Sequence, residues 1–124
     1  MKLLLDTHAA LWWLSGDDRF GETAGAWLTD ETNQVLLSAV VVWEVAIKRS
    51  LGKLEAPPDF APTLLGAGAL PLPITLEHAA AVEELPWHHR DPFDRLIVAQ
   101  SSIEGATLLS HDEALRPYGV PLVW

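Results

Sequence analysis

The chain has 124 residues, of which 49% are hydrophobic, and this length and composition suit a single domain, 1–124, with a real core. The formal net charge of −9 argues against a nucleic-acid binder that works through bulk positive charge. Because the chain contains no cysteine, a disulfide framework and a thiolate zinc site are both excluded.

The predicted secondary structure alternates strands with helices along the whole chain. In chain order, the pattern predicts a strand at 2–5, helices at 9–14 and 22–30, a strand at 34–37, helices at 40–51 and 59–66, a short or edge strand at 70–74, helices at 76–85 and 92–105, a strand at 107–109, a helical turn at 113–116 and a strand at 120–124. This alternation favours an α/β fold whose parallel sheet is covered on both faces.

Two of the predicted helices carry a polar residue next to the expected core. Thr7 is a suitable N-cap for the helix at 9–14. The helix at 40–51 has an apolar stripe that consists of Val40, Trp43, Ile47 and Leu51. Glu44 lies four residues after Val40 and three before Ile47 and shares their face, so we expect its carboxylate to be turned toward the interior.

The start of the helix at 92–105 places two carboxylates one turn apart. Pro92 suits the first helical position, where a missing N–H costs nothing. Asp91 then falls at the N-cap and Asp94 in the first turn. A carboxylate at the start of a buried helix is either a cap or part of a site. Because Asp91 supplies the cap, Asp94 is the candidate for a site.

No apolar run of the sequence is long enough to cross a membrane. The N-terminal run is stopped by Asp6, which makes it too short for a signal peptide. The run at 39–43 is broken by Glu44. We therefore expect a cytoplasmic protein without a membrane partner.

Four acidic residues from separate segments are expected at one edge of the sheet. Asp6 directly follows the first strand, and Asp112 lies just beyond the strand at 107–109. Glu44 follows the second strand, and Asp94 opens a helix that starts from the same edge. Sites in open parallel sheets form beyond the carboxyl ends of the strands. The four carboxylates are therefore predicted to converge.

Such a cluster indicates a metal-dependent reaction. Several carboxylates in close contact cannot all stay ionised without a cation between them. Ligand sets made only of oxygen select Mg²⁺ or Mn²⁺ rather than zinc. One such ion, or two ions about 3.5–4 Å apart, can bind a phosphodiester and orient an attacking water. The predicted reaction is hydrolysis of a phosphodiester.

Each acid also has a purely structural interpretation. Asp6 could begin the turn after the first strand, and Asp112 could be an ordinary turn residue. Glu44 could form a surface ion pair with Lys48, four residues later, worth only about 0.3–0.5 kcal/mol. The position of Glu44 on the apolar stripe argues against that alternative.

Hydroxyl and imidazole groups flank the acids. Thr7 and Ser110 could orient a carboxylate or a metal-bound water, or could act as helix caps. His8 and His111 could be ligands, phosphate contacts or packed imidazoles, and packing is the preferred interpretation. The histidine pair at 88–89 lacks the spacing of a helical zinc pair.

Several segments resemble the PIN-domain toxins of the VapC type. The resemblance is carried by Leu-Leu-Leu-Asp-Thr-His at 3–8, Trp-Glu-Val-Ala-Ile-Lys at 43–48, His-Arg-Asp-Pro-Phe-Asp-Arg at 89–95, Ser-His-Asp at 110–112 and the closing run at 118–124. It covers nearly the whole chain. It implies a single PIN domain with a Rossmann-like three-layer α/β/α sandwich and a parallel sheet of four or five strands.

The resemblance also implies an activity and a set of site residues. The expected activity is that of a Mg²⁺-dependent endoribonuclease, in which Mn²⁺ can substitute. The acids of the family fall on Asp6, Glu44, Asp94 and Asp112, which would be both catalytic residues and metal ligands. Asp91 is implied as a helper or cap.

The expected partners follow from the same resemblance. A type II toxin of this kind pairs with a VapB-like antitoxin, which blocks the site and contacts operator DNA through its own domain. The toxin is expected to form a homodimer and to cut tRNA or rRNA. Basic residues are few, and the candidates for contacts with RNA phosphates are Lys48, Arg49, Lys53 and Arg90.

Three other functions are alternatives to the nuclease. A phosphatase with Asp6 as nucleophile would need a second acid two residues later, where His8 stands. A nucleotide-binding Rossmann module would need a Gly-rich loop after the first strand, which the sequence lacks. The third alternative is a catalytically inactive PIN-like module that only engages an antitoxin or RNA. The presence of all four acids argues against it, and a lack of metal binding would favour it.

Overall fold

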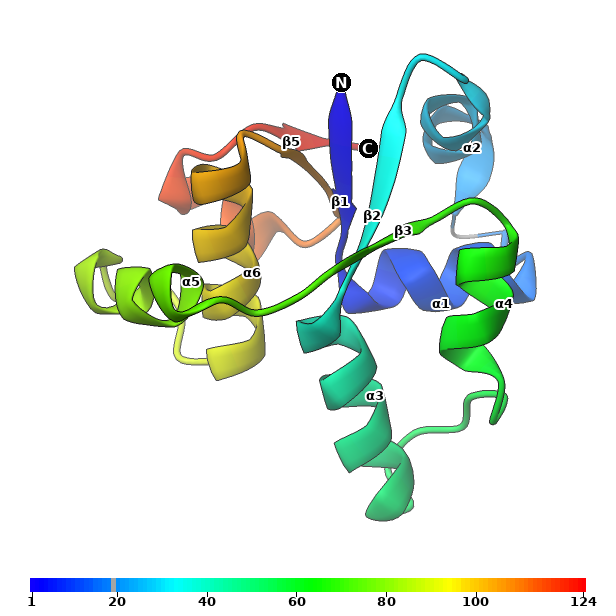
Figure 1. The fold of residues 1–124 in the computed structure, drawn as a ribbon, viewed down its shortest axis with the longest axis horizontal. Coiled ribbons are helices and arrows are strands. Elements are labelled where there is room, and N and C mark those ends of the chain that lie inside the picture. The colour runs from blue at the N-terminus through cyan, green and yellow to red at the C-terminus, as the bar shows by residue number, and fades with distance from the viewer. Residues whose placement is uncertain (19) are drawn as a thin grey trace.

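The computed structural model describes residues 1–18 and 20–124. Parallel strands form a five-stranded sheet in the order β3-β2-β1-β4-β5 (Figure 1). The strands are β1 (Lys2–Leu5), β2 (Gln34–Ser38), β3 (Leu70–Leu72), β4 (Thr107–Leu109) and β5 (Leu122–Val123). The predicted α/β fold with a parallel sheet is confirmed.

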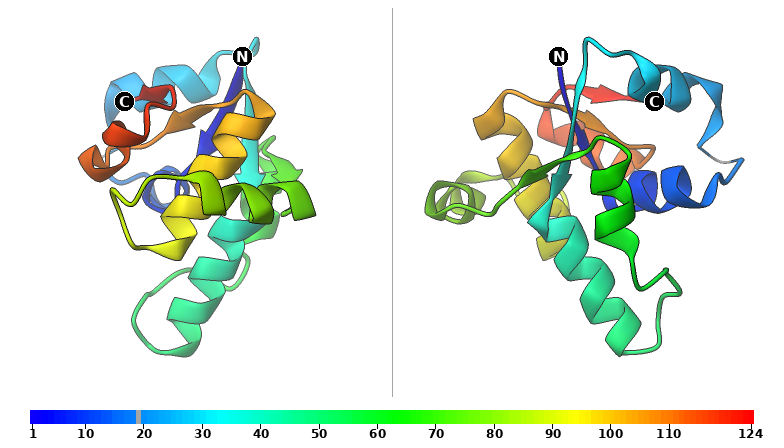
Figure 2. Two further views of the ribbon diagram at one scale, coloured as in Figure 1. Left: turned by 90° about the vertical axis from the view of Figure 1, so that its left-hand side faces the viewer. Right: turned by 45° about the vertical axis from the view of Figure 1, so that its right-hand side comes forward.

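Helices cover both faces of this sheet. The α-helices are α1 (Thr7–Ser15), α2 (Gly21–Thr29), α3 (Ala39–Ser50), α4 (Phe60–Gly66), α5 (Leu76–Ala81) and α6 (Pro92–Glu104), and the 3₁₀ helices are η1 (Val82–Glu84) and η2 (Glu113–Tyr118). In two views, α1, α2 and α4 lie on one side of the sheet, and α5 and α6 on the other (Figures 1 and 2). Within the described ranges, none of the helices has the length and apolar character needed to cross a membrane.

The strand order creates a switch point between β1 and β4. The chain adds β2 and then β3 on one side of β1, and afterwards returns to add β4 on the other side. β4 pairs in parallel register with β1, with Leu5 opposite Leu109. In open α/β sheets the crevice for a ligand forms at such a reversal, beyond the carboxyl ends of the strands. Asp6 and the residues after Leu109 lie at that position.

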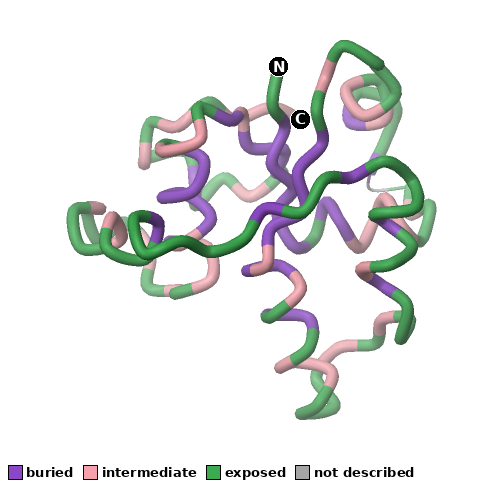
Figure 3. Tube along the Cα trace, viewed as in Figure 1, coloured by how far each residue is buried: buried purple, intermediate pink, exposed green. Residues whose placement is uncertain are grey.

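The core lies between the sheet and its helices. Leu3, Leu4 and Leu5 of β1 are completely buried, as expected for a central strand covered on both faces. On α6, the apolar run at 97–99 is buried as well, which agrees with the density of apolar residues in that helix. Buried positions follow the strands and the inner faces of the helices (Figure 3).

Two local predictions at the start of the chain and in α3 were wrong. The N-cap of α1 is Asp6, whose side chain accepts the Ala9 N–H, and Thr7 is the first helical residue. The buried residues of α3 are Val40, Val41, Glu44 and Val45. Trp43 is 51% and Leu51 60% exposed, because α3 packs against α1 and α6 and projects beyond the sheet edge (Figure 1). Glu44 nevertheless lies on the buried face, as predicted.

Other elements differ from the prediction only in length. The predicted helix at 76–85 is divided into α5 and η1, and the strands predicted at 70–74 and 120–124 are confined to three and two residues. Pro73 has no N–H to donate to a neighbouring strand, which explains the early end of β3. These edge strands lie on either side of β2, β1 and β4.

Candidate active site

Asp6 joins the sheet to α1 at the switch point. Its residue surface is 5% exposed. The Oδ1 atom accepts the Ala9 N–H at 2.7 Å, and Oδ2 accepts the Ser110 hydroxyl. Burial raises the pKa of Asp6 above its ordinary value, against the opposing effect of these hydrogen bonds. The negative charge of Asp112 raises the pKa further, so the two acids interact.

Ser110 organises the acids that follow β1 and β4. Its hydroxyl donates to Asp6 and accepts the backbone N–H of Asp112 at 3.1 Å. Asp112 is the N-cap of η2, and its Oδ1 accepts the Ala114 N–H at 2.9 Å. The structural interpretation of Asp112 as a turn residue is therefore correct for Oδ1. It leaves the other carboxylate oxygen, Oδ2, outside the cap.

Glu44 reaches the site from α3 and has two partners. Its Oε1 accepts the Thr7 hydroxyl at 2.6 Å, and its Oε2 accepts from the Nζ of Lys48. The ion pair considered as a structural alternative thus exists, but Glu44 is 5% exposed and is not a surface residue. The hydrogen bond from Lys48 to Glu44 raises the pKa of Lys48, and the charges of Asp91 and Asp94 act in the same direction.

The predicted start of α6 is confirmed. Pro92 occupies the first turn and Asp91 is the N-cap. The Oδ1 atom of Asp91 accepts the N–H groups of Phe93 at 2.8 Å and Asp94 at 3.3 Å. Because Asp91 satisfies these donors, the Asp94 carboxylate is not needed as a cap.

The fold also raises the pKa of Asp94. Burial and the charge of Asp91 raise its pKa to about 6, with Glu44 adding to the effect. The Nε2 of His89 lies 2.8 Å from Oδ2 of Asp94, and this hydrogen bond lowers the pKa of Asp94. Burial and repulsion exceed the effect of His89, as expected for a carboxylate placed among other acids without a cation.

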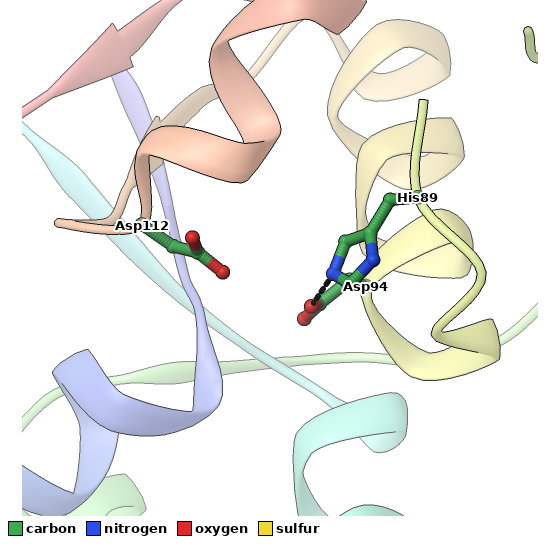
Figure 4. Close-up of side chains that lie close together, drawn as sticks. All are labelled: His89, Asp94 and Asp112. Carbon is green, nitrogen blue, oxygen red and sulfur yellow. Dashed lines mark hydrogen bonds and ion pairs between the residues drawn. The ribbon is translucent and has the colours of Figure 1, made fainter. Parts of the chain in front are cut away.

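One ligand atom from each of His89, Asp94 and Asp112 lies within 4.8 Å of the others. Asp94 and Asp112 approach each other from α6 and from the turn after β4 (Figure 4). This set offers two carboxylate oxygens and one imidazole nitrogen, which are ligand types that can hold a divalent cation. The set adds His89 to the residues predicted from the sequence.

The four predicted acids are linked by proximity or charge. Asp94 lies beside Asp112 and is affected by the charge of Glu44, while Asp112 affects Asp6. Sequence reasoning missed His89 because only a helical metal-ligand spacing was considered. No spacing rule would have found it, since it lies in the loop before α6 and meets Asp94 through the tertiary fold.

The PIN domain family matches residues 3–120 of this chain. The chain belongs to the PIN domain family. This PIN domain matches no curated protein.

Solved structures share the fold of this PIN domain over nearly its whole length. VapBC2 from Rickettsia felis, bound to a DNA fragment from their promoter, has a TM-score of 0.74 at 15% identity, covering 100% of this chain and 99% of that chain. VapBC-1 from nontypeable Haemophilus influenzae has a TM-score of 0.70 at 14% identity, covering 99% and 97%. A toxin–antitoxin complex from Klebsiella pneumoniae has a TM-score of 0.68 at 17% identity, covering 98% and 96%. At these identities the likeness concerns the fold.

The four basic residues predicted to contact phosphates come from two segments of this PIN domain, the end of α3 with the residues after it and the segment before α6. Lys48 pairs with Glu44 beside the acids, and Arg90 is exposed next to His89. Arg49 lies in the last turn of α3 and Lys53 beyond its end, more than one turn past Glu44.

The metal-free PIN domain is expected to become more stable as the pH falls from about 6 to about 4. The pKa of Asp94 is about 6 in the folded chain, against 3.8 as its ordinary value, so the folded state binds this proton more tightly. The free energy of unfolding therefore decreases as the pH rises through this window, by roughly 3 kcal/mol in total.

Thermal unfolding of wild type and Asp94→Asn in EDTA would measure this contribution. Asparagine carries no charge, so the variant should be more stable at about pH 7, and the difference should disappear near pH 4. A variant that is less stable than wild type at about pH 7 would show that ionised Asp94 is not destabilised by burial.

Proposed function

We propose that this PIN domain is a metal-dependent endoribonuclease and the toxin of a type II toxin–antitoxin pair of the VapC type. The observation that supports the proposal is the approach of His89, Asp94 and Asp112 to within 4.8 Å of one another at their ligand atoms. Glu44 is close enough to affect the pKa of Asp94, and Asp112 affects the pKa of Asp6. Family membership supports a nuclease, and the fold shared with VapBC complexes supports a toxin.

Asp94 and Asp112 would hold the cation, with His89, Asp6 and Glu44 around them. Mg²⁺ is the proposed ion and Mn²⁺ a substitute, because the ligands are mainly carboxylate oxygens. When bound, such an ion supplies charge stabilisation to a phosphodiester and makes water a better nucleophile near neutral pH.

Neighbouring side chains hold these carboxylates in position. Thr7 and Lys48 both bond Glu44, so its two oxygens have fixed directions. Ser110 joins Asp6 to the backbone of Asp112. Such partners of metal ligands orient the ligand atoms before the ion binds. Thr7, Ser110 and Asp91 therefore act as supporting residues in this proposal.

The raised pKa values of Asp6 and Asp94 also bear on metal binding. A cation must displace any proton from its carboxylate ligands, so affinity falls as the pH decreases through about 6, the pKa of Asp94. The same repulsion that raises these pKa values would be relieved by the positive ion.

RNA is the proposed substrate, with tRNA or rRNA as the class that the resemblance implies. The net charge of −9 is distributed over the whole chain. Lys48 contacts Glu44, and Arg90 is exposed and follows His89 in the sequence, so these two are the proposed contacts for flanking phosphates. Arg49 and Lys53 could contact only a strand that continues along α3.

A VapB-like antitoxin and a second copy of the chain are the proposed protein partners, and operator DNA would be contacted only through the antitoxin. The solved VapBC structures support an antitoxin as partner. Exposed large apolar side chains also support protein contacts, since Leu76 is 91% and Trp87 77% exposed.

Incubation of the purified, antitoxin-free chain with total RNA tests this function. With Mg²⁺ or Mn²⁺ we expect cuts at discrete positions, and with EDTA we expect none. The melting temperature should rise with either ion, because only the folded chain offers the assembled ligands. A folded chain that gives neither cuts nor a metal-dependent rise would instead be an inactive PIN-like binding module.

A further inference from the structure

A cavity of about 350 Å³ adjoins the carboxylate cluster. Asp6 and Asp112 form one part of its lining, and the rings of His8, Trp12 and His111 form the rest. His8 and His111 are exposed, so the rings can be reached from solvent. The cavity is therefore acidic on the side of the proposed reaction and aromatic elsewhere.

The rings that line this cavity are held by contacts between distant segments. The rings of His8 and Trp12 on α1 are 5.6 Å apart and inclined by 30°. Trp124 packs edge-on against both Trp12, at 5.3 Å, and His111, at 5.2 Å. Trp124 also contacts Phe20 at 5.3 Å. The aromatic part of the lining is thus fixed before any ligand arrives.

We propose that this cavity binds an unpaired nucleobase next to the phosphodiester at the carboxylate cluster, an inference that rests on the proposed nuclease function. Proteins recognise single-stranded RNA by stacking bases on aromatic and histidine rings. Asp6 and Asp112 belong to the proposed metal site, where the phosphodiester would bind, and this leaves the rings of His8, Trp12 and His111 for the neighbouring base. The cavity thereby selects unpaired RNA over a continuous duplex.

The test compares two labelled strands by fluorescence anisotropy in Mg²⁺. One is a short single-stranded RNA, and the other is an abasic strand with the same number of phosphates. Binding is measured with Asp94→Asn as the parent, so that the RNA is not cut. His111→Ala removes one ring, and His111→Phe keeps a ring while removing the imidazole nitrogens. His88→Ala is the matched control, because His88 is exposed and contacts Tyr118 outside this cavity.

We expect His111→Ala to weaken binding of the RNA on the order of tenfold and to leave the abasic strand unaffected. His111→Phe and His88→Ala should bind both strands like the parent. Equal weakening of both strands by His111→Ala would make His111 a phosphate contact and would overturn the proposal. Unchanged binding of both strands by His111→Ala would also overturn the proposal. The ring-lined cavity would then be a site for a protein side chain.

The outcomes separate this proposal from the nuclease. If wild type cuts RNA but His111→Ala binds both strands like the parent, the base subsite is wrong and the nuclease stands. If base-dependent binding is lost with His111→Ala while wild type makes no metal-dependent cuts, the base subsite stands and the nuclease fails. Unchanged melting temperatures of the histidine variants would show that the changes in binding do not arise from unfolding.

Discussion

Replacement of Asp94 by asparagine is expected to reduce metal-dependent RNA cleavage by about two to three orders of magnitude. Asparagine has nearly the same shape but cannot supply an anionic oxygen to the cation. Asp94 lies within 4.8 Å of Asp112 at its ligand atoms and is affected by the charge of Glu44, so it is central to the cluster. A bound metal stabilises the reacting phosphate by several kcal/mol, and about 1.4 kcal/mol corresponds to a tenfold change in rate.

Cleavage rates at one discrete RNA position, with enzyme in excess over RNA, would measure this effect. The matched control is Asp91→Asn, which removes the same charge three residues earlier and leaves a good N-cap. We expect the control to retain its rate within about threefold, because Asp91 already uses Oδ1 for the N–H groups of α6. An equal loss of cleavage rate in both variants would show that the loss comes from the change in net charge rather than from a missing metal ligand. An unchanged rate in Asp94→Asn would remove Asp94 from the site.

The measurement has an internal check on folding. Asp94→Asn should be more stable than wild type in EDTA at about pH 7, because an ionised carboxylate with a raised pKa is destabilising there. Mg²⁺ should raise the melting temperature of wild type and have little effect on the variant. A more stable but inactive variant would exclude unfolding as the cause of the lost activity.

Removal of the Arg95 side chain is expected to cause the largest loss of stability of the substitutions considered. Arg95 is 2% exposed although it is charged. Its Nη1 donates to the Pro86 carbonyl at 2.9 Å, and its Nη2 donates to the Val82 carbonyl at 3.1 Å. The guanidinium carbon also lies 3.9 Å from the centroid of the Trp87 ring. Arg95 thereby attaches the segment that carries His89 to α6.

We expect Arg95→Ala to lower the free energy of unfolding by about 3–5 kcal/mol, because it leaves several backbone carbonyls without their donor and opens a cavity. The melting temperature should fall on the order of 10 °C. Arg116→Ala is the matched control, since Arg116 pairs with Glu113 at the surface, where an ion pair contributes little. Equal melting temperatures of the two variants would show that other contacts hold the segment before α6.

Much of the secondary structure could be predicted because its causes are local. At Pro92, the fixed φ angle and the missing N–H favour a helix start, and the cap by Asp91 involves residues two and three positions away. Thr107–Leu109 is a strand within the predicted bounds. The predicted N-cap of α1 was wrong by one residue, because Asp6 caps this helix in place of Thr7.

The alternation of strands and helices was also sufficient to predict the parallel sheet. That four acids form one site at the carboxyl edge of this sheet stays a prediction. The contacts within the site depend on packing between distant segments. Ser110 bonds Asp6 across 104 positions of the chain. His89 meets Asp94 through a loop conformation held by Arg95, and Trp124 packs against two rings of the cavity, those of Trp12 and His111. Periodicity and capping extend over a few residues, so only the tertiary structure could decide which distant side chains meet.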